Sequence, residues 1–332
     1  MMLALATVAA SCDDGEAEPP PAPEVTALAS FGSGLGSGST VGPDGALYVT
    51  DGNAGGVVRV DPASGDTTPF AEGLPPQVMG IGGAMDLAFI DDTAYVLVTL
   101  VGGDILDGDH IGDDVSGIYR LEDDGAFTVI ADIGAWSVDH PPATDFFITT
   151  GVHYAMEATG DGLLITDGHH NRVLRVGLDG DISEMGSFEN VVPTGLETSG
   201  DTVYMGQAGP LPHQREDGRV LELGPDSSTA TEVAAGASMI VDIEFAGKSL
   251  YALSQGEWDG VQEGSPASPD TGRLLAVGEG GLTPMLDGSG EEIVLDRPTS
   301  LEFIGETAYI VTFAGEVLRI DNIPAVPDDT SS

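Results

Sequence analysis

Hydrophobic and polar positions recur along the chain in six similar units. Each unit opens with a five-residue segment, and the fourth residue of that segment lies eight positions before a hydrophobic anchor. The opening segments are residues 37–41, 84–88, 153–157, 193–197, 240–244 and 298–302, and their anchors are Tyr48, Tyr95, Leu164, Tyr204, Tyr251 and Tyr309. Turn residues such as Gly160-Asp161-Gly162 fill the gap, so each unit predicts two strands joined by a tight turn.

A third apolar segment follows in every unit, and a weaker fourth one follows it. The third segments are residues 57–60, 118–121, 173–176, 220–223, 274–277 and 317–320, and residues 127–131 are an example of the fourth. Four antiparallel strands repeated six times predict an all-β fold, a six-bladed β-propeller spanning residues 25–322.

The two ends of the repeat predict how the ring closes. Only a short acidic tail follows Ile320, so the last blade lacks an outer strand of its own. Residues 24–30, with Val25, Ala27 and Leu28 apolar, precede the first blade. We expect them to supply that strand, because such pairing removes an open sheet edge.

Long insertions fall at one place in the repeat. They separate the second and third strands of three blades, at residues 98–116, 206–218 and 255–272, and the connection of residues 133–152 between blades is also long. In a propeller these loops share one face. We expect the ligand or partner to bind there, because binding residues concentrate on loops carried by a rigid scaffold.

Charge limits the choice of partners. The 332 residues include 55 acidic and 10 basic side chains, a net charge of −45, and Lys248 is the only lysine. Such a surface repels nucleic acid and anionic lipid headgroups, and attracts cations and basic proteins.

The only cysteine, Cys12, lies at the end of a short apolar run. The sequence Ala10-Ser11-Cys12 is similar to a bacterial lipobox, in which the cysteine is lipidated after cleavage, although no basic residue precedes the run. We therefore expect residues 1–12 to be a signal segment, residues 13–24 a disordered acidic, proline-rich tether, and residues 323–332 a disordered acidic tail. The predicted location is the cell envelope, where the chain is expected to be a monomer that touches the membrane only through its lipid. The alternative is an ordinary cleaved signal and a secreted protein.

Three stretches of the repeat resemble one family of exported bacterial propellers. They are Gly42-Pro43-Asp44-Gly45-Ala46-Leu47-Tyr48-Val49, the run from Leu164 through Asp167-Gly168-His169-His170-Asn171-Arg172 to Val176, and Val192-Pro193-Thr194-Gly195-Leu196. They are similar to the ScyD/ScyE family, and more broadly to NHL-repeat and gluconolactonase-like propellers. The resemblance implies the fold but no particular reaction. The third blade departs from it by opening with His153-Tyr154, where the family tends to have Pro-Tyr.

Carboxylates recur on the innermost strands. The fifth position of the opening segments holds Glu157, Glu197, Glu244 and Glu302, and the third position holds Asp86 and Asp242 in opposite blades. Oxygen ligands around an axial channel suit Ca²⁺, so we predict a metal site among Asp86, Glu157, Glu197, Asp242 and Glu302. The alternative is that these carboxylates only face water in the channel of an acidic protein.

Three other groups of residues carry possible chemistry. All six histidines are predicted near the loop-rich face, and His153, at the start of an inner strand, is the candidate general base. Aspartates around His110 in the second blade could bind calcium, although their spacing does not match an EF-hand. Recurrent arginines on the third strands are expected to pair with nearby carboxylates: Arg59, Arg120, Arg175 and Arg319.

The sequence leaves two functions open. The first is a non-catalytic binding or scaffolding propeller at the cell envelope, favoured by the tether, the loop-rich face and the lack of a nucleophile motif. The second is a Ca²⁺-dependent hydrolase or lactonase with channel carboxylates and His153 as base. A quinone-dependent sugar dehydrogenase has the same blade count, but the scarcity of basic residues disfavours binding of an acidic quinone.

Overall fold

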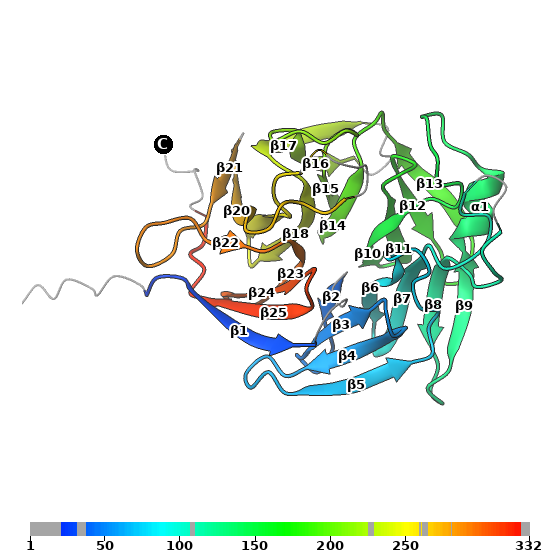
Figure 1. The fold of residues 1–332 in the computed structure, drawn as a ribbon, viewed down its shortest axis with the longest axis horizontal. Coiled ribbons are helices and arrows are strands. Elements are labelled where there is room, and N and C mark those ends of the chain that lie inside the picture. Colours follow the sequence, from blue (N-terminus) through cyan, green and yellow to red (C-terminus); the bar gives the residue numbers. More distant parts are fainter. Residues whose placement is uncertain are drawn as a thin grey trace, which may run out of the picture.

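The chain folds into six blades arranged around a central axis (Figure 1). The computed structural model describes residues 21–31, 38–106, 110–224, 229–258, 260, 265–279 and 281–326. Each blade is a twisted antiparallel sheet, and the predicted six-bladed propeller is confirmed. Cys12 and the signal segment lie outside the described residues. In the part of the chain that the structure describes, no helix is long and apolar enough to cross a membrane.

Strand order within a blade follows chain order from the axis outwards. The first three blades are β2 (Ser39–Val41), β3 (Leu47–Asp51), β4 (Gly56–Val60) and β5 (Thr67–Glu72); β6 (Gly83–Ile90), β7 (Thr93–Thr99), β8 (Gly117–Leu121) and β9 (Phe127–Asp132); and β10 (His153–Thr159), β11 (Gly162–Asp167), β12 (Arg172–Val176) and β13 (Ile182–Ser187).

The remaining blades repeat this order, with a divided outer strand in the fifth. They are β14 (Pro193–Ser199), β15 (Thr202–Gln207), β16 (Gly218–Leu223) and β17 (Ala230–Ala237); β18 (Ile240–Ala246), β19 (Ser249–Ser254), β20 (Gly272–Gly278), β21 (Gly281–Pro284) and β22 (Val294–Leu295); and β23 (Pro298–Ile304), β24 (Thr307–Thr312) and β25 (Glu316–Asp321). Both β21 and β22 pair with β20.

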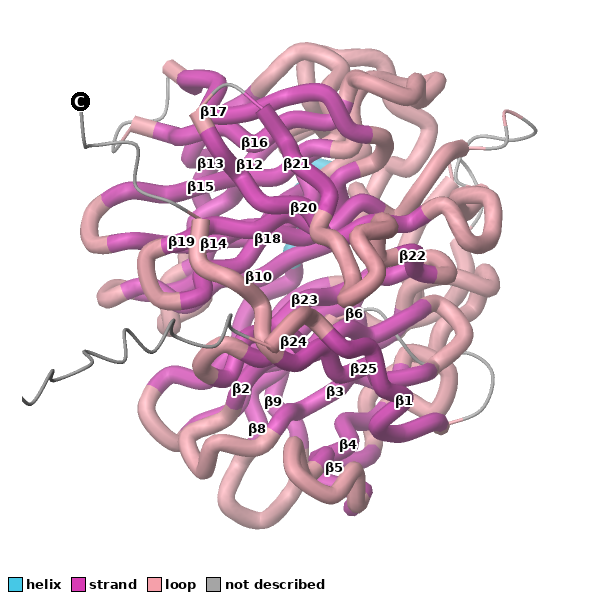
Figure 2. Tube along the Cα trace, turned by 90° about the vertical axis from the view of Figure 1, so that its left-hand side faces the viewer, coloured by secondary structure: helices cyan, strands magenta, loops and turns pink. Residues whose placement is uncertain are grey.

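The ring closes as the sequence predicts. Strand β1 (Glu24–Ser30) pairs antiparallel with β25 and completes the last blade, so the first and last strands of the chain lie side by side (Figure 2). Val25 lies opposite Ile320 and Ala27 opposite Leu318, with a bulge just before Ala29. The pairing leaves β1, and no longer β25, at the outer edge of this blade.

Turn length sets the register of the inner hairpins. In blades 4, 5 and 6 a two-residue turn joins the first two strands, and its glycine has a φ of +63°, +63° or +67°, at Gly200, Gly247 and Gly305 respectively. This left-handed backbone suits glycine and matches the twist of a hairpin. As a result, the fifth residue of the opening segment pairs with the hydrophobic anchor, as Glu197 does with Tyr204. Blade 1 has a longer turn and pairs Thr40 with Tyr48.

The hydrophobic core lies between neighbouring blades. Leu97 and Ile118 of blade 2, for example, pack in one buried cluster with Leu163 and Ile165 of blade 3. Because each sheet has an apolar face towards the next sheet, closing the ring buries both faces of every blade.

Two features differ from the sequence-based expectation. The connection between blades 2 and 3 contains a helix, α1 (Ile133–Asp139), whose first turn is capped by Asp132: its carboxylate accepts a hydrogen bond from Ala135 N at 2.8 Å. Beyond β25 the chain stays packed against the blades, since Ile323 is buried and its N–H donates to Glu306 O. The packed domain thus extends past residue 322.

We predict that loss of β1 weakens ring closure. A truncated chain beginning at residue 31 should unfold at least about 5 °C below a chain beginning at residue 22, because β25 then becomes an unpaired edge. Thermal unfolding followed by circular dichroism measures the difference. Equal midpoints for the two truncations would contradict a stabilising role for β1.

Candidate functional site

The innermost strands β2, β6, β10, β14, β18 and β23 surround a small cavity on the axis (Figure 1). Its volume is about 50 Å³, enough for a few water molecules. Five carboxylates line it: Asp86, Glu157, Asp242, Glu244 and Glu302. None of the described residues in the wall is basic.

Two opposite aspartates bridge neighbouring blades at the axis. Asp86 Oδ2 accepts a hydrogen bond from Met156 N of blade 3 at 2.7 Å, and Asp242 Oδ2 accepts one from Leu301 N of blade 6 at 2.7 Å. An innermost strand has no strand partner on its axial side, so its N–H groups need other acceptors. The two aspartates supply them in blades three positions apart around the ring.

Close approach of the strands depends on glycine. A Cβ added to Gly38 would lie 2.3 Å from Asp86 Oδ1 and 2.7 Å from Met85 O. No side chain fits there, so Gly38 allows blade 1 to approach the Asp86 carboxylate.

Glu197 lies beside the cavity and forms a third bridge. Its carboxylate accepts hydrogen bonds from Thr198 N at 2.6 Å and from Phe245 N of blade 5 at 3.4 Å. The Thr198 hydroxyl then donates to Glu157 Oε1 at 2.9 Å. Two of the predicted site residues are thereby linked through one threonine.

The structure brings the sequence-predicted carboxylates together and adds one. Glu244, which belongs to the same repeat position but was left out of the predicted metal set, also lines the cavity. Its place in the glutamate column was the signal that could have identified it. Among the described residues, no three acidic or histidine side chains converge closely enough to form a ready-made metal site.

Burial and mutual repulsion raise the pKa values of the channel carboxylates. Burial, followed by repulsion from Glu197, raises the pKa of Glu157 to about 8. Burial raises the pKa of Asp242 to about 7, even though it accepts two backbone hydrogen bonds. The pKa values of Asp86, Glu244 and Glu302 are also raised well above their ordinary range, by burial first and then by neighbouring carboxylates. At neutral pH the cluster therefore retains protons or needs a cation.

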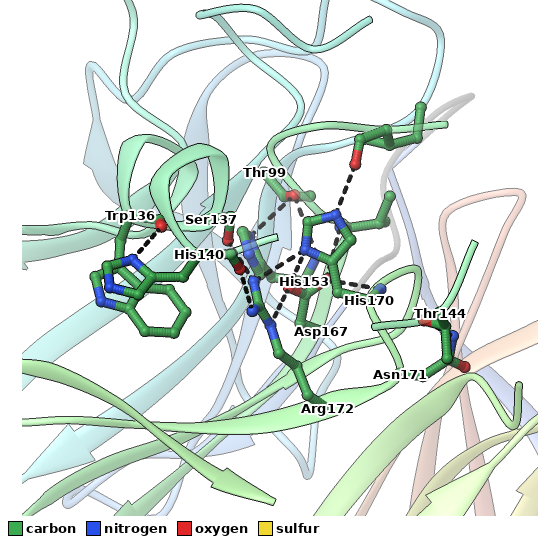
Figure 3. A network of polar contacts seen from close by, with 12 residues as sticks. Thr99, Trp136, Ser137, His140, Thr144, His153, Asp167, His170, Asn171 and Arg172 are labelled. Carbon is green, nitrogen blue, oxygen red and sulfur yellow. Dashed lines mark hydrogen bonds and ion pairs between the residues drawn. The ribbon is translucent and has the colours of Figure 1, made fainter. Parts of the chain in front are cut away.

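A second polar network lies apart from the cavity, at the end of blade 3 on the loop-rich face (Figure 3). Asp167 ends β11 and Arg172 begins β12, and both side chains are buried. Arg172 Nε donates to Asp167 Oδ2 at 3.1 Å. Burial alone would raise the pKa of Asp167, but the hydrogen bond from His170 and the charges of nearby imidazoles and Arg172 lower it to about 2.

The candidate base His153 belongs to this network and does not line the cavity. Its side chain is fully buried, and its backbone N–H donates to Thr99 Oγ1 at 3.2 Å. Burial lowers the pKa of His153 to about 4, so its ring is neutral near pH 7. The wall of the cavity begins one residue later, at Tyr154.

The other predicted groups lie on the surface. His110 is exposed between Asp104 and Asp113, at 3.3 Å from each, while Asp107 and Asp109 lie outside the described residues. The expected ion pairs of the recurrent arginines are confirmed: Arg59 with Asp44, Arg120 with Glu122, Arg175 with Asp161 and Arg319 with Asp321.

Comparison with known proteins finds similar folds among solved structures but no match in sequence. No family model matches the chain, and no curated protein matches it in sequence. Among solved structures, a gluconolactonase from Xanthomonas campestris is similar with a TM-score of 0.57 at 12% identity, covering 92% of this chain and 95% of the other.

Two further solved structures are similar at the level of fold. A PQQ-bound aldose sugar dehydrogenase from Streptomyces coelicolor gives a TM-score of 0.52 at 15% identity, covering 91% and 99% of the two chains. A virginiamycin B lyase from Staphylococcus aureus gives a TM-score of 0.50 at 13% identity, covering 91% of this chain and 99% of the other. At such identities only the propeller fold is shared.

We predict that the domain loses stability as pH rises above 6.5 in the presence of a chelator. A carboxylate with a raised pKa holds its proton in the native state after the unfolded state has lost it, so its contribution is present at low pH and disappears as pH rises towards about 8. His153 acts in the opposite direction only below pH 6.5, because its pKa is lowered to about 4. Urea unfolding at several pH values measures the slope.

The variant Glu157→Gln should flatten this slope and be more stable than the parent at high pH by about 1–2 kcal/mol, because the uncharged amide needs no proton. Glu184→Gln, on the exposed outer strand β13, is the matched control and should leave the slope unchanged. A parent protein whose stability does not change above pH 6.5 would contradict the raised pKa values.

Proposed function

We propose that this chain is a non-catalytic binding propeller of the bacterial cell envelope, held there by a lipid on Cys12, and that its channel binds a hard cation such as Ca²⁺. The observation that carries the cation is the group of partly exposed carboxylates around an axial cavity whose described wall has no basic side chain. The resemblance to the ScyD/ScyE propellers and the Ala10-Ser11-Cys12 sequence support the envelope location.

The donor set suits a hard cation, because only carboxylate, hydroxyl and backbone groups offer oxygen around the cavity. Asp86 and Asp242 already accept backbone hydrogen bonds, which leaves Glu157, Glu244 and Glu302 as the main candidate ligands. Their side chains do not converge in this structure and would have to turn towards the ion to bind it. Bound Ca²⁺ would neutralise their repulsion and connect blades 3, 5 and 6 across the axis. The remaining ligand positions would be filled by water, since Ca²⁺ takes six to eight oxygens.

A metal-dependent hydrolase is the alternative, and two observations weigh against it. Pockets for small organic ligands usually measure about 300–1,000 Å³, whereas this cavity measures about 50 Å³. The base predicted from the sequence, His153, is buried outside the cavity wall. The likeness to a gluconolactonase concerns the fold alone.

We predict that Ca²⁺ raises the thermal unfolding midpoint by several degrees relative to chelator at the same ionic strength and pH 8, because a ligand that binds only the native state stabilises it. The shift should be largely lost in the double variant Glu157→Gln/Glu302→Gln and kept in the surface control Glu184→Gln. If Ca²⁺ has no effect beyond that of an equal ionic strength of NaCl, the channel cation is refuted.

The lipid anchor is tested separately. With a basic segment added before Met1 to complete the export signal, the protein should appear in the membrane fraction of a bacterial host and incorporate labelled fatty acid. The variant Cys12→Ser should be unlabelled and soluble. Equal partitioning and labelling of the two proteins would contradict lipidation at Cys12.

A further inference from the structure

The connection between blades 2 and 3 presents two adjacent aromatic rings on the loop-rich face. Phe146 and Phe147 are 38% and 50% exposed, although large apolar side chains are usually buried. Phe146 packs edge-on against the His170 ring at 5.1 Å between centroids, and Phe147 packs edge-on against His169 at 4.7 Å. Each ring is thus held from one side and open on the other.

Arg172 fixes the part of this connection that precedes the two rings (Figure 3). Its Nη1 donates to His140 O at 2.8 Å, and its Nη2 donates to Ser137 Oγ at 2.9 Å. The guanidinium also lies 4.9 Å from the ring centre of Trp136 in α1. One buried side chain therefore holds α1 and the residue that follows it.

His170 and Asn171 fix the connection on either side of the rings. His170 Nε2 donates to Ile148 O at 2.8 Å, directly after Phe147. Asn171 Nδ2 donates to Thr144 Oγ1 at 3.3 Å, two residues before Phe146. The turn between β11 and β12 therefore holds both flanks of the aromatic pair, which limits the entropy lost when a partner binds.

The composition of the chain makes this arrangement informative. Only 10 of the 332 residues are Lys or Arg. Arg172 is 1% exposed, so one of these few cationic side chains lies in the interior and not on the surface. Burying a charge is costly unless it is paired, as it is here with Asp167. A buried network that holds one surface loop in a single shape is expected where that shape matters for binding.

The surroundings of the two rings are acidic. Asp145 precedes them and is exposed. The neighbouring blade-2 loop is joined to the connection by Thr149, whose N–H donates to Ile105 O at 2.9 Å. This loop carries Asp104 and Asp113, which are both exposed and each lie 3.3 Å from the exposed His110 between them. Exposed aromatic faces next to carboxylates favour guanidinium groups, which stack on rings and pair with carboxylates at once.

We propose that Phe146 and Phe147 form the centre of a docking surface for an arginine-rich segment of another protein. The surface consists of these two rings with Asp145, Asp104 and Asp113. The proposal rests on the proposed binding function and gives the chemistry of the partner. Arginine is preferred over lysine because only its planar guanidinium stacks closely on a phenyl ring.

The test compares oligo-arginine and oligo-lysine peptides of equal length, by fluorescence anisotropy with the full chain carrying Cys12→Ser. A net charge of −45 attracts both peptides, so the informative quantity is the ratio of their affinities. The parent should bind oligo-arginine about tenfold more tightly. In Phe146→Leu/Phe147→Leu, which keeps apolar side chains and all charges, the ratio should fall to about two or less.

The control is Phe313→Leu, which alters another exposed ring, in the turn between β24 and β25, and should keep the full ratio. A ratio near one in the parent, or a ratio unchanged in the double variant, would overturn the proposal. The channel carboxylates are intact in these proteins, so the calcium-dependent midpoint still reports on the proposed function independently.

Discussion

Closing six blades into a ring leaves the inner edge of each first strand without a strand partner. The N–H groups on that edge are too far inside the molecule to rely on bulk water alone. In this chain three of the described acceptors are carboxylates of the preceding blade: Asp86 for Met156, Glu197 for Phe245 and Asp242 for Leu301. The same side chains that join the blades thus place acidic groups close together around the axis.

As a result, the carboxylates around the axis would repel one another if all of them were ionised. Glu157, Glu244 and Glu302 add acidic groups two positions further along the repeat, and no described residue of the cavity wall offers a positive charge. The raised pKa values follow from this arrangement, because each carboxylate meets low solvation and like charge together. Protons at low pH, or a cation at higher pH, relieve the same repulsion. The cavity is large enough for an ion and small enough to exclude a sugar-sized substrate.

Much of this architecture could be predicted from the sequence, because it follows from short-range periodicity. The spacing between Glu302 and Tyr309, for instance, fixes a hairpin whose two-residue turn needs a glycine at position 305. The repeat also places the channel carboxylates at two positions of the innermost strands, around one cavity. It could not show that His153 is enclosed, since that depends on how residues 133–152 fold over blade 3. The packing of Ile323 likewise depends on contacts far away in the sequence.

The channel carboxylates have no positive charge beside them in the described cavity wall. We therefore expect them to hold protons near neutral pH when no cation is bound. Carbon-13 NMR of the labelled carboxyl groups, titrated in chelator and assigned with Glu157→Gln, measures this directly. We expect Glu157 to titrate with a pKa of about 8, and added Ca²⁺ to shift its titration to lower pH. A Glu157 carboxyl that titrates at its ordinary value of 4.5 in chelator would contradict it.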